Sequence, residues 1–161
     1  MARREGGRER RRKRNTLFPL CSPVKPFTLH PLFEKASGLT ESIIGAAIEV
    51  HRDKGPGLIE SIYDWCLTKE LELRGLSCLS QKLVVISYKG FTCEEPLRFD
   101  LLVAGCVRVE AKAVDKILPI HKAQLLSYMK LLDIPIGLLI NFHEMKLTDG
   151  VHRLILPGAG R

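Results

Sequence analysis

The chain has 161 residues, of which 45% are hydrophobic and 27% are charged, and its net charge is +7. This length suits one domain with a hydrophobic core, and the apolar content excludes a wholly disordered chain. The longest strongly apolar stretch, 134–142, is far shorter than the ~20 residues that cross a bilayer, so we expect no membrane-spanning segment.

The positive charge is concentrated at the start of the chain. Residues 1–14 hold eight basic and two acidic residues, whereas the remaining chain holds 17 basic and 16 acidic residues. Four prolines follow between positions 19 and 31. We predict a disordered Arg- and Pro-rich tail over 1–37, a folded domain over 38–156 and a flexible C-terminus over 157–161. The tail either binds polyanions weakly or has no function of its own.

Apolar residues at helical spacing predict a helix from Thr40, as its cap, to Lys54, ended by the Gly55-Pro56-Gly57 segment. A second helix is expected from Leu58 to Arg74, before Gly75. Later elements are recognised by β-branched residues, turn glycines and prolines. They are strands over 79–88, 97–104 and 106–113, a helix over 119–132, and strands over 136–142 and 151–156. This order predicts an α/β fold with a central mixed β-sheet flanked by helices.

The cysteines bear on the cellular compartment. Five are present, an odd number, and no two have CxxC spacing. This pattern argues against a disulfide framework or a zinc site. The N-terminus also lacks the long apolar run of a signal peptide. We therefore expect reduced thiols in a cytoplasmic protein.

Two carboxylates lie on strands that a tight turn at Gly105 joins. The turn brings Asp100 near Glu110, and strand alternation places Lys112 on the same face as Glu110. Burying both carboxylates unpaired would cost several kcal/mol, and a hard divalent cation such as Mg²⁺ or Mn²⁺ removes that cost. From these residues alone, a salt bridge between Glu110 and Lys112 explains the pattern equally well.

Two helices contribute further polar residues. On the helix over 119–132, His121, Gln124 and Tyr128 share one side at the edge of the apolar stripe. They need hydrogen-bond partners, which a phosphate, a water, a metal-site carboxylate or ordinary core groups can supply, and for His121 the core is favoured. Glu60 lies in the first turn of its helix, where the macrodipole favours a carboxylate with or without a metal.

Gly57, Glu60 and Tyr63 have the spacing of the motif that names the GxxExxY family of small bacterial and archaeal proteins, and the chain resembles that family. Further matching segments occur in the same order, at 44–51, 98–103, 110–113, 124–128 and 137–142. The family is placed in the PD-(D/E)XK nuclease superfamily. The resemblance therefore implies a restriction-endonuclease-like core of one helix, three strands, a helix and a strand.

The resemblance also implies roles for individual residues. It implies a catalytic Lys112 beside a metal ion whose ligands are Asp100, Glu110, Glu60 and the Ala111 carbonyl. Gln124 and Tyr128 are similar to the Gln-x-x-x-Tyr pair that faces the substrate backbone in RecB-type exonucleases. Phe99 departs from the superfamily pattern, because it stands where the name has proline.

We therefore predict a nuclease that uses Mg²⁺ or Mn²⁺ to hydrolyse phosphodiester bonds of nucleic acid, with DNA as the expected substrate. The alternative is a catalytically silent module that binds nucleic acid or protein on a nuclease scaffold. A protein partner or a homodimer is left open. Saturable metal binding that depends on Asp100 distinguishes the enzyme from the silent module.

Overall fold

The computed structural model describes residues 29–160. Five strands form one sheet in the order β1-β2-β3-β4-β5. Their bounds are β1 Cys78–Tyr88, β2 Phe91–Val103, β3 Val107–Lys112, β4 Ile136–Asn141 and β5 Val151–Ile155. The sheet is mixed, because β3 and β4 pair in parallel whereas the other neighbours are antiparallel. The predicted α/β fold with a mixed sheet is confirmed.

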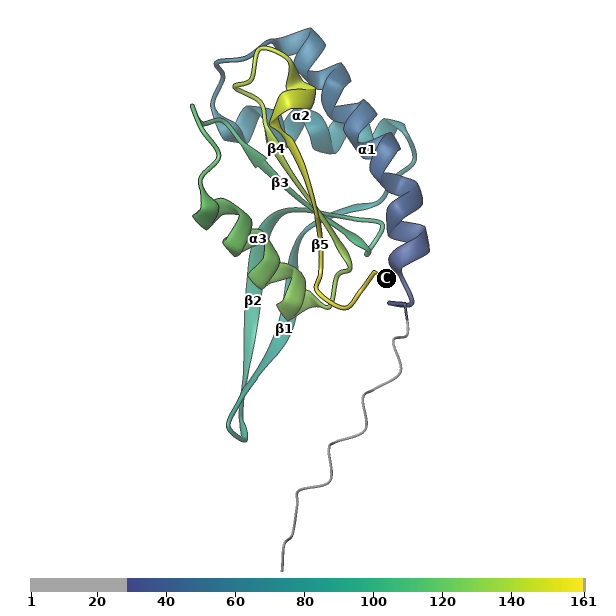
Figure 1. The fold of residues 1–161 in the computed structure, drawn as a ribbon, viewed down its shortest axis with the longest axis vertical. Helices are drawn as coiled ribbons and strands as arrows, with labels where there is room; N and C mark the ends of the chain where they lie inside the picture. The colour runs from purple at the N-terminus through teal and green to yellow at the C-terminus, as the bar shows by residue number, and fades with distance from the viewer. Residues whose placement is uncertain (1–28, 161) are drawn as a thin grey trace, which may run out of the picture.

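Helices cover both faces of this sheet (Figure 1). The helices are α1 Phe33–Lys54, α2 Glu60–Leu73 and α3 Pro119–Leu132, and a short 3-10 helix, Leu147–Gly150, precedes β5. Val109 and Ala111 of β3 belong to the buried cluster that holds α1 and α2. Leu139 of β4 instead packs with Leu125 and Met129 of α3. Within the described residues, no helix is both long and apolar enough to cross a membrane.

The first helix begins earlier than its sequence predicts. Helix α1 starts at Phe33, seven residues before Thr40, and Ala36 is fully buried in the core. The Thr40 hydroxyl donates to the carbonyl of Ser37 within the helix, so Thr40 is not the cap. The predicted end of the tail at residue 37 is therefore too late, because the first turn of α1 already packs against the domain. Residues 1–28 of that tail lie outside the described residues.

The C-terminal residues are also held against the domain. Ala159 is buried, its N–H donates to the carbonyl of Leu156, and its own carbonyl accepts from the N–H of His30 at 3.1 Å. Residues 157–160 therefore form a turn that closes against the start of the chain, rather than the flexible end predicted from Pro157 and the two glycines.

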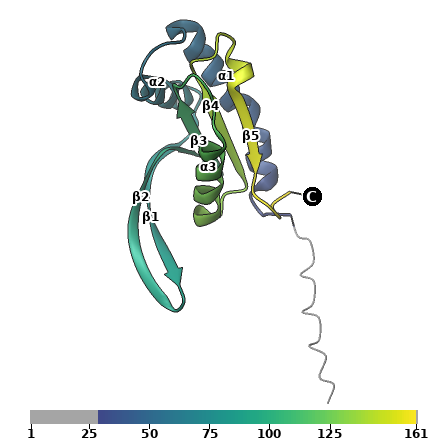
Figure 2. The same cartoon turned by 60° about the vertical axis from the view of Figure 1, so that its left-hand side comes forward.

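Strands β1 and β2 form a long hairpin, most of which curves away from the rest of the molecule (Figure 2). Its two-residue turn consists of Lys89 and Gly90, which both have positive φ, at 48° and 88°. Such turns match the twist of antiparallel strands. Strand β2 begins at Phe91, six residues before the predicted start at Leu97, because pairing with β1 continues through Glu94, Glu95 and Pro96. We call residues 80–98 of this hairpin the arm.

The arm joins the sheet at an irregularity in β2. Leu79 pairs with Leu102, but Gln81 pairs with Arg98, so β2 has two more residues than β1 in this stretch. Such a bulge changes which side chains face each side of the sheet. Phe99 accordingly packs on the α3 side, whereas Leu101 packs under α1 and α2. Asp100 lies between them, at the bulge.

Candidate active site

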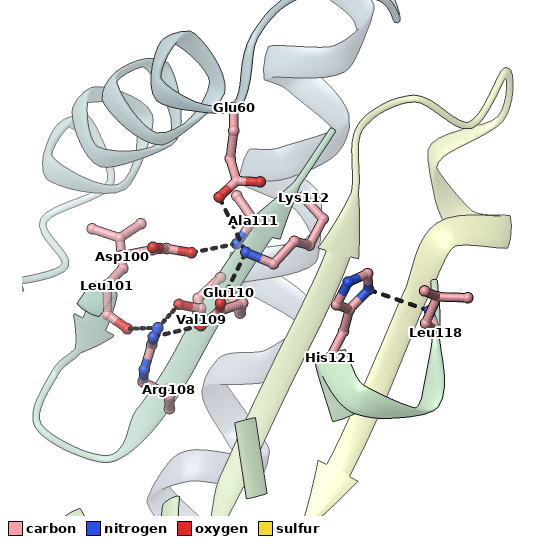
Figure 3. A network of polar contacts seen from close by, with 10 residues as sticks. All are labelled: Glu60, Asp100, Leu101, Arg108, Val109, Glu110, Ala111, Lys112, Leu118 and His121. Carbon is pink, nitrogen blue, oxygen red and sulfur yellow. Dashed lines mark hydrogen bonds and ion pairs between the residues drawn. The ribbon is translucent and has the colours of Figure 1, made fainter. Parts of the chain in front are cut away.

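The antiparallel pairing of β2 with β3 places Asp100 at the edge of the site. The ladder pairs Leu101 with Val109, so Asp100 follows opposite Glu110, as the turn at Gly105 predicts. At this point the side chain of Asp100, and not a backbone carbonyl, bonds to β3: Asp100 Oδ2 accepts the N–H of Ala111 at 3.0 Å (Figure 3). This bond fixes the Asp100 carboxylate beside β3 and leaves its other oxygen free of that contact.

Lys112 lies between two carboxylates. Its Nζ is 2.9 Å from Glu110 Oε1 on the same strand and 3.1 Å from Glu60 Oε1 on α2 (Figure 3). Burial alone would lower the pKa of Lys112, but the bonds to Glu110 and Glu60 outweigh burial and raise it. The lysine is therefore protonated at neutral pH, and it links the start of α2 to the end of β3. The ion pair that sequence reasoning offered as an alternative is present, and it lies inside the candidate site.

A fourth acidic residue, Asp64, lies at the site. It lies one turn after Glu60 on α2, and one oxygen atom each of Glu60, Asp64 and Asp100 lies within 4.8 Å of the other two. The Oδ1 atom of Asp64 is buried and has no hydrogen-bond partner among residues 29–160. Sequence reasoning missed Asp64, although its i,i+4 spacing from Glu60 places both on one helix face.

The pKa values of Asp64 and Asp100 are both raised. Burial, followed by the charges of Asp100 and Glu60, raises the pKa of Asp64 to about 7. Burial and the charge of Glu110 raise the pKa of Asp100 to about 6, against the opposing effects of Arg108 and Lys112. Clustered carboxylates with an unpartnered buried oxygen are the ligand set that a hard divalent cation prefers. The residues present therefore fit Mg²⁺ or Mn²⁺.

Glu110 is held differently from these three. Its Oε2 is 2.6 Å from Arg108 Nη2, and its Oε1 is the atom that contacts Lys112. Arg108 is almost completely buried, and its guanidinium also donates to the carbonyls of Leu101 and Val109. Sequence reasoning missed Arg108 as well, although it shares a strand face with Glu110 and Lys112. In the described structure Glu110 thus positions Lys112 instead of joining the three clustered carboxylates.

A family model described as the PD-(D/E)XK nuclease superfamily matches residues 37–154. The chain belongs to the PD-(D/E)XK nuclease superfamily. The match reaches from α1 into β5 and includes every residue of the acidic cluster. No curated protein and no solved structure gave a match. The comparisons establish the superfamily, and the narrower GxxExxY assignment stays a prediction.

The remaining predicted site residues of this PD-(D/E)XK protein, Gln124 and Tyr128, lie on helix α3 together with His121. The Tyr128 ring is half-buried, with its centroid 5.9 Å from the Arg108 guanidinium carbon, and therefore lies next to the group that holds Glu110. Gln124, one turn earlier, is exposed. His121 forms a local hydrogen bond instead. Its Nδ1 accepts the N–H of Leu118 at the start of the helix, at 3.2 Å (Figure 3).

Gly57 and Tyr63, which share a sequence motif with Glu60, stabilise the loop that leads to Glu60 in this PD-(D/E)XK protein. The Tyr63 hydroxyl donates to the carbonyl of Gly55 at 2.7 Å and accepts the N–H of Leu58 at 3.0 Å. Its ring is buried and stacks on Phe142, with the centroids 4.5 Å apart. Gly57 has φ of +100°, a conformation that favours glycine. Tyr63 thus fixes the loop before α2 and, through it, the position of Glu60.

Proposed function

We propose that this protein is a metal-dependent nuclease that hydrolyses phosphodiester bonds of DNA. The observation that carries the proposal is the convergence of Glu60, Asp64 and Asp100 beside Lys112, with one buried carboxylate oxygen that has no partner in the described part of the chain. Membership of a nuclease superfamily supports the same chemistry.

Mg²⁺ or Mn²⁺ is the proposed cofactor. Glu60, Asp64 and Asp100 would hold the ion, and the resemblance to the family implies Glu110 and the Ala111 carbonyl as further ligands. When bound, such an ion supplies a Lewis acid for the scissile phosphate and lowers the pKa of a bound water. The protein contributes carboxylates that a helix and a sheet bring together.

Lys112 is the proposed catalytic lysine. Because its ammonium is protonated at neutral pH, it acts as a hydrogen-bond donor that orients the attacking water and offsets charge on the phosphate. Glu110 positions this ammonium and is itself held by Arg108. Gln124 and Tyr128 on α3 are proposed to contact the substrate backbone.

Two narrower assignments belong to the same proposal. The spacing of Gly57, Glu60 and Tyr63, together with the role of Tyr63 in the loop before α2, supports placement in the GxxExxY family. The cysteines of the described residues are all free, which supports a cytoplasmic location.

The test is cleavage of supercoiled plasmid, linear duplex and single-stranded DNA by purified wild type and Lys112→Ala, each with Mg²⁺, Mn²⁺ or EDTA. We expect metal-dependent cleavage by the wild type and a loss of ~10²–10³-fold in Lys112→Ala, because the water and the phosphate lose a positioned hydrogen-bond donor. Lys116→Ala is the matched control, since Lys116 is exposed in the following loop. It should cleave like the wild type.

Two results would contradict the proposal. Cleavage that persists in Lys112→Ala would show a contaminating nuclease or a wrong role for this lysine. Intact substrates throughout, with metal binding also undetectable by calorimetry, would favour the silent binding module on a nuclease scaffold.

Metal binding should depend on pH. A carboxylic acid must lose its proton to bind a cation, and the pKa values of about 7 for Asp64 and about 6 for Asp100 place both losses near neutrality. Raising the pH from 5.5 to 7.5 should therefore increase Mn²⁺ affinity by more than about tenfold. Calorimetric titration measures this, and Asp64→Asn should flatten the upper part of the profile. An affinity independent of pH over this range would contradict these assignments.

A further inference from the structure

The arm presents apolar side chains to solvent. Leu83 and Val85 are 61% and 60% exposed, and Tyr88 and Phe91 beside the turn are 66% and 79% exposed. Val84 of the arm packs into the cluster on the α3 side of the sheet, but a two-stranded hairpin with little such support is at best marginally stable in water. An exposed apolar surface of this kind indicates an interaction site.

The two strands of the arm differ in how they are protected against strand addition. Native proteins block exposed edges with charges and proline, and β2 carries Glu94, Glu95 and Pro96 along the arm. Strand β1 is the edge strand of the whole sheet, and its segment Leu83–Ile86 has neither a charge nor a proline. The open edge of the arm is therefore that of β1.

The charge of the arm argues for a protein partner over a nucleic acid. Residues 80–98 hold three basic and two acidic side chains. A surface that binds nucleic acid needs a clear excess of basic residues to neutralise phosphates. The nearly balanced arm, with its apolar edge, instead matches another β-strand of similar character.

The sequence of β1 is complementary to itself. In an antiparallel pairing of two copies centred on Val84, Leu83 lies opposite Val85, and Lys82 lies opposite Ile86. Such a pairing sets no two like charges opposite each other between positions 80 and 88. A two-fold axis through Val84 would satisfy both edges at once, as closed symmetry requires.

Exposed apolar side chains also flank the open edge of β1. They are Leu79, Leu83, Val85, Ile86 and Tyr88. Pairing of two β1 edges brings such side chains of one copy beside those of the other, and cross-strand apolar pairs stabilise a sheet.

We propose that the partner is a second copy of this chain, and that β1 of one copy pairs antiparallel with β1 of the other, centred on Val84. The two sheets then continue through the arms as one sheet. The proposal does not depend on the nuclease activity, because it rests on the edge, charge and exposure of the arm.

The test uses sedimentation equilibrium of the full chain at ~1–200 μM in 0.5 M salt, which suppresses bridging by nucleic acid. The variant Val85→Lys places two lysines near the two-fold axis without changing a buried residue. We expect the wild type to be a dimer and the dissociation constant of Val85→Lys to be at least ~100-fold higher. Thr92→Lys, which adds the same charge to an exposed position on β2, is the matched control and should dimerise like the wild type.

Hydrogen exchange locates the interface. In the wild type, backbone amides within 83–86 should exchange more slowly as the protein concentration rises, and Val85→Lys should lose this effect. A wild type that is monomeric throughout, a Val85→Lys variant that dimerises normally, or association seen only when nucleic acid is added would each overturn the proposal. Metal titration of Val85→Lys separates this test from that of the nuclease, since its acidic cluster is unchanged.

Discussion

Replacing Asp100 by Asn is expected to abolish both Mn²⁺ binding and cleavage. The substitution removes one of three clustered carboxylates, and a bound metal supplies several kcal/mol of charge stabilisation in such a reaction. A loss of that size corresponds to ~10³–10⁵-fold in rate. The fold should survive, because the Asn side-chain oxygen can still accept the N–H of Ala111 at the bulge. Calorimetry and the cleavage assay measure the two effects, and urea unfolding monitors stability.

The control is Asp115→Asn, which makes the same chemical change at an exposed position just after β3. It should bind metal and cleave DNA like the wild type. If Asp100→Asn still binds metal, the metal site lies outside the cluster of Glu60, Asp64 and Asp100. Loss of cleavage with intact metal binding would instead assign Asp100 to the positioning of Ala111 and its strand.

Replacing Arg108 by Ala is expected to lower the free energy of unfolding by about 3–5 kcal/mol, because removing one partner of a buried ion pair leaves the other charge uncompensated. The side chains of Arg108 and Glu110 are 1% and 5% exposed. Arg108 also stacks near the rings of Phe99 and Tyr128, so packing is lost together with the charge. Urea unfolding of the metal-free protein at neutral pH measures the change.

Arg153→Ala is the matched control, since Arg153 is exposed and bonds only the Ser37 hydroxyl among the described residues. It should change the free energy of unfolding by less than about 0.5 kcal/mol. A loss below about 1 kcal/mol in Arg108→Ala would show that Lys112 compensates Glu110 without the arginine.

Much of the fold follows from local sequence signals. Helix α3 has the predicted bounds, because Pro119 opens it and Asp133, in a left-handed conformation, closes it before Pro135. Pro31 indicates a linker and so favours a later start of α1, whereas burial of Ala36 extends the helix backwards to Phe33. The first half of β2 was missed because Pro96 and two glutamates are poor strand formers, and only the pairing with β1 makes them extended.

The candidate site was predictable where a single turn or strand alternation determines it. The turn at Gly105 sets the register that brings Asp100 to Glu110, and alternation puts Lys112 beside Glu110. The i,i+4 spacing places Asp64 on the same helix face as Glu60. Whether that face meets Asp100 depends on how α2 packs on the sheet, which no local spacing determines. Arg108 was overlooked because a charged residue inside an apolar strand is expected at the surface, whereas here it is buried by its bonds to Glu110 and two carbonyls.

The acidic cluster also has a consequence for how the native state is held together. Glu60 and Asp64 come from α2 and Asp100 comes from β2, so their carboxylates meet only after the helix has docked on the sheet. The bond from Lys112 to Glu60 already joins the helix to the sheet. A bound divalent ion would act as a second, removable cross-link between them and shift the unfolding equilibrium by mass action. The concentration of free Mg²⁺ would then tune the free energy of unfolding as well as the activity.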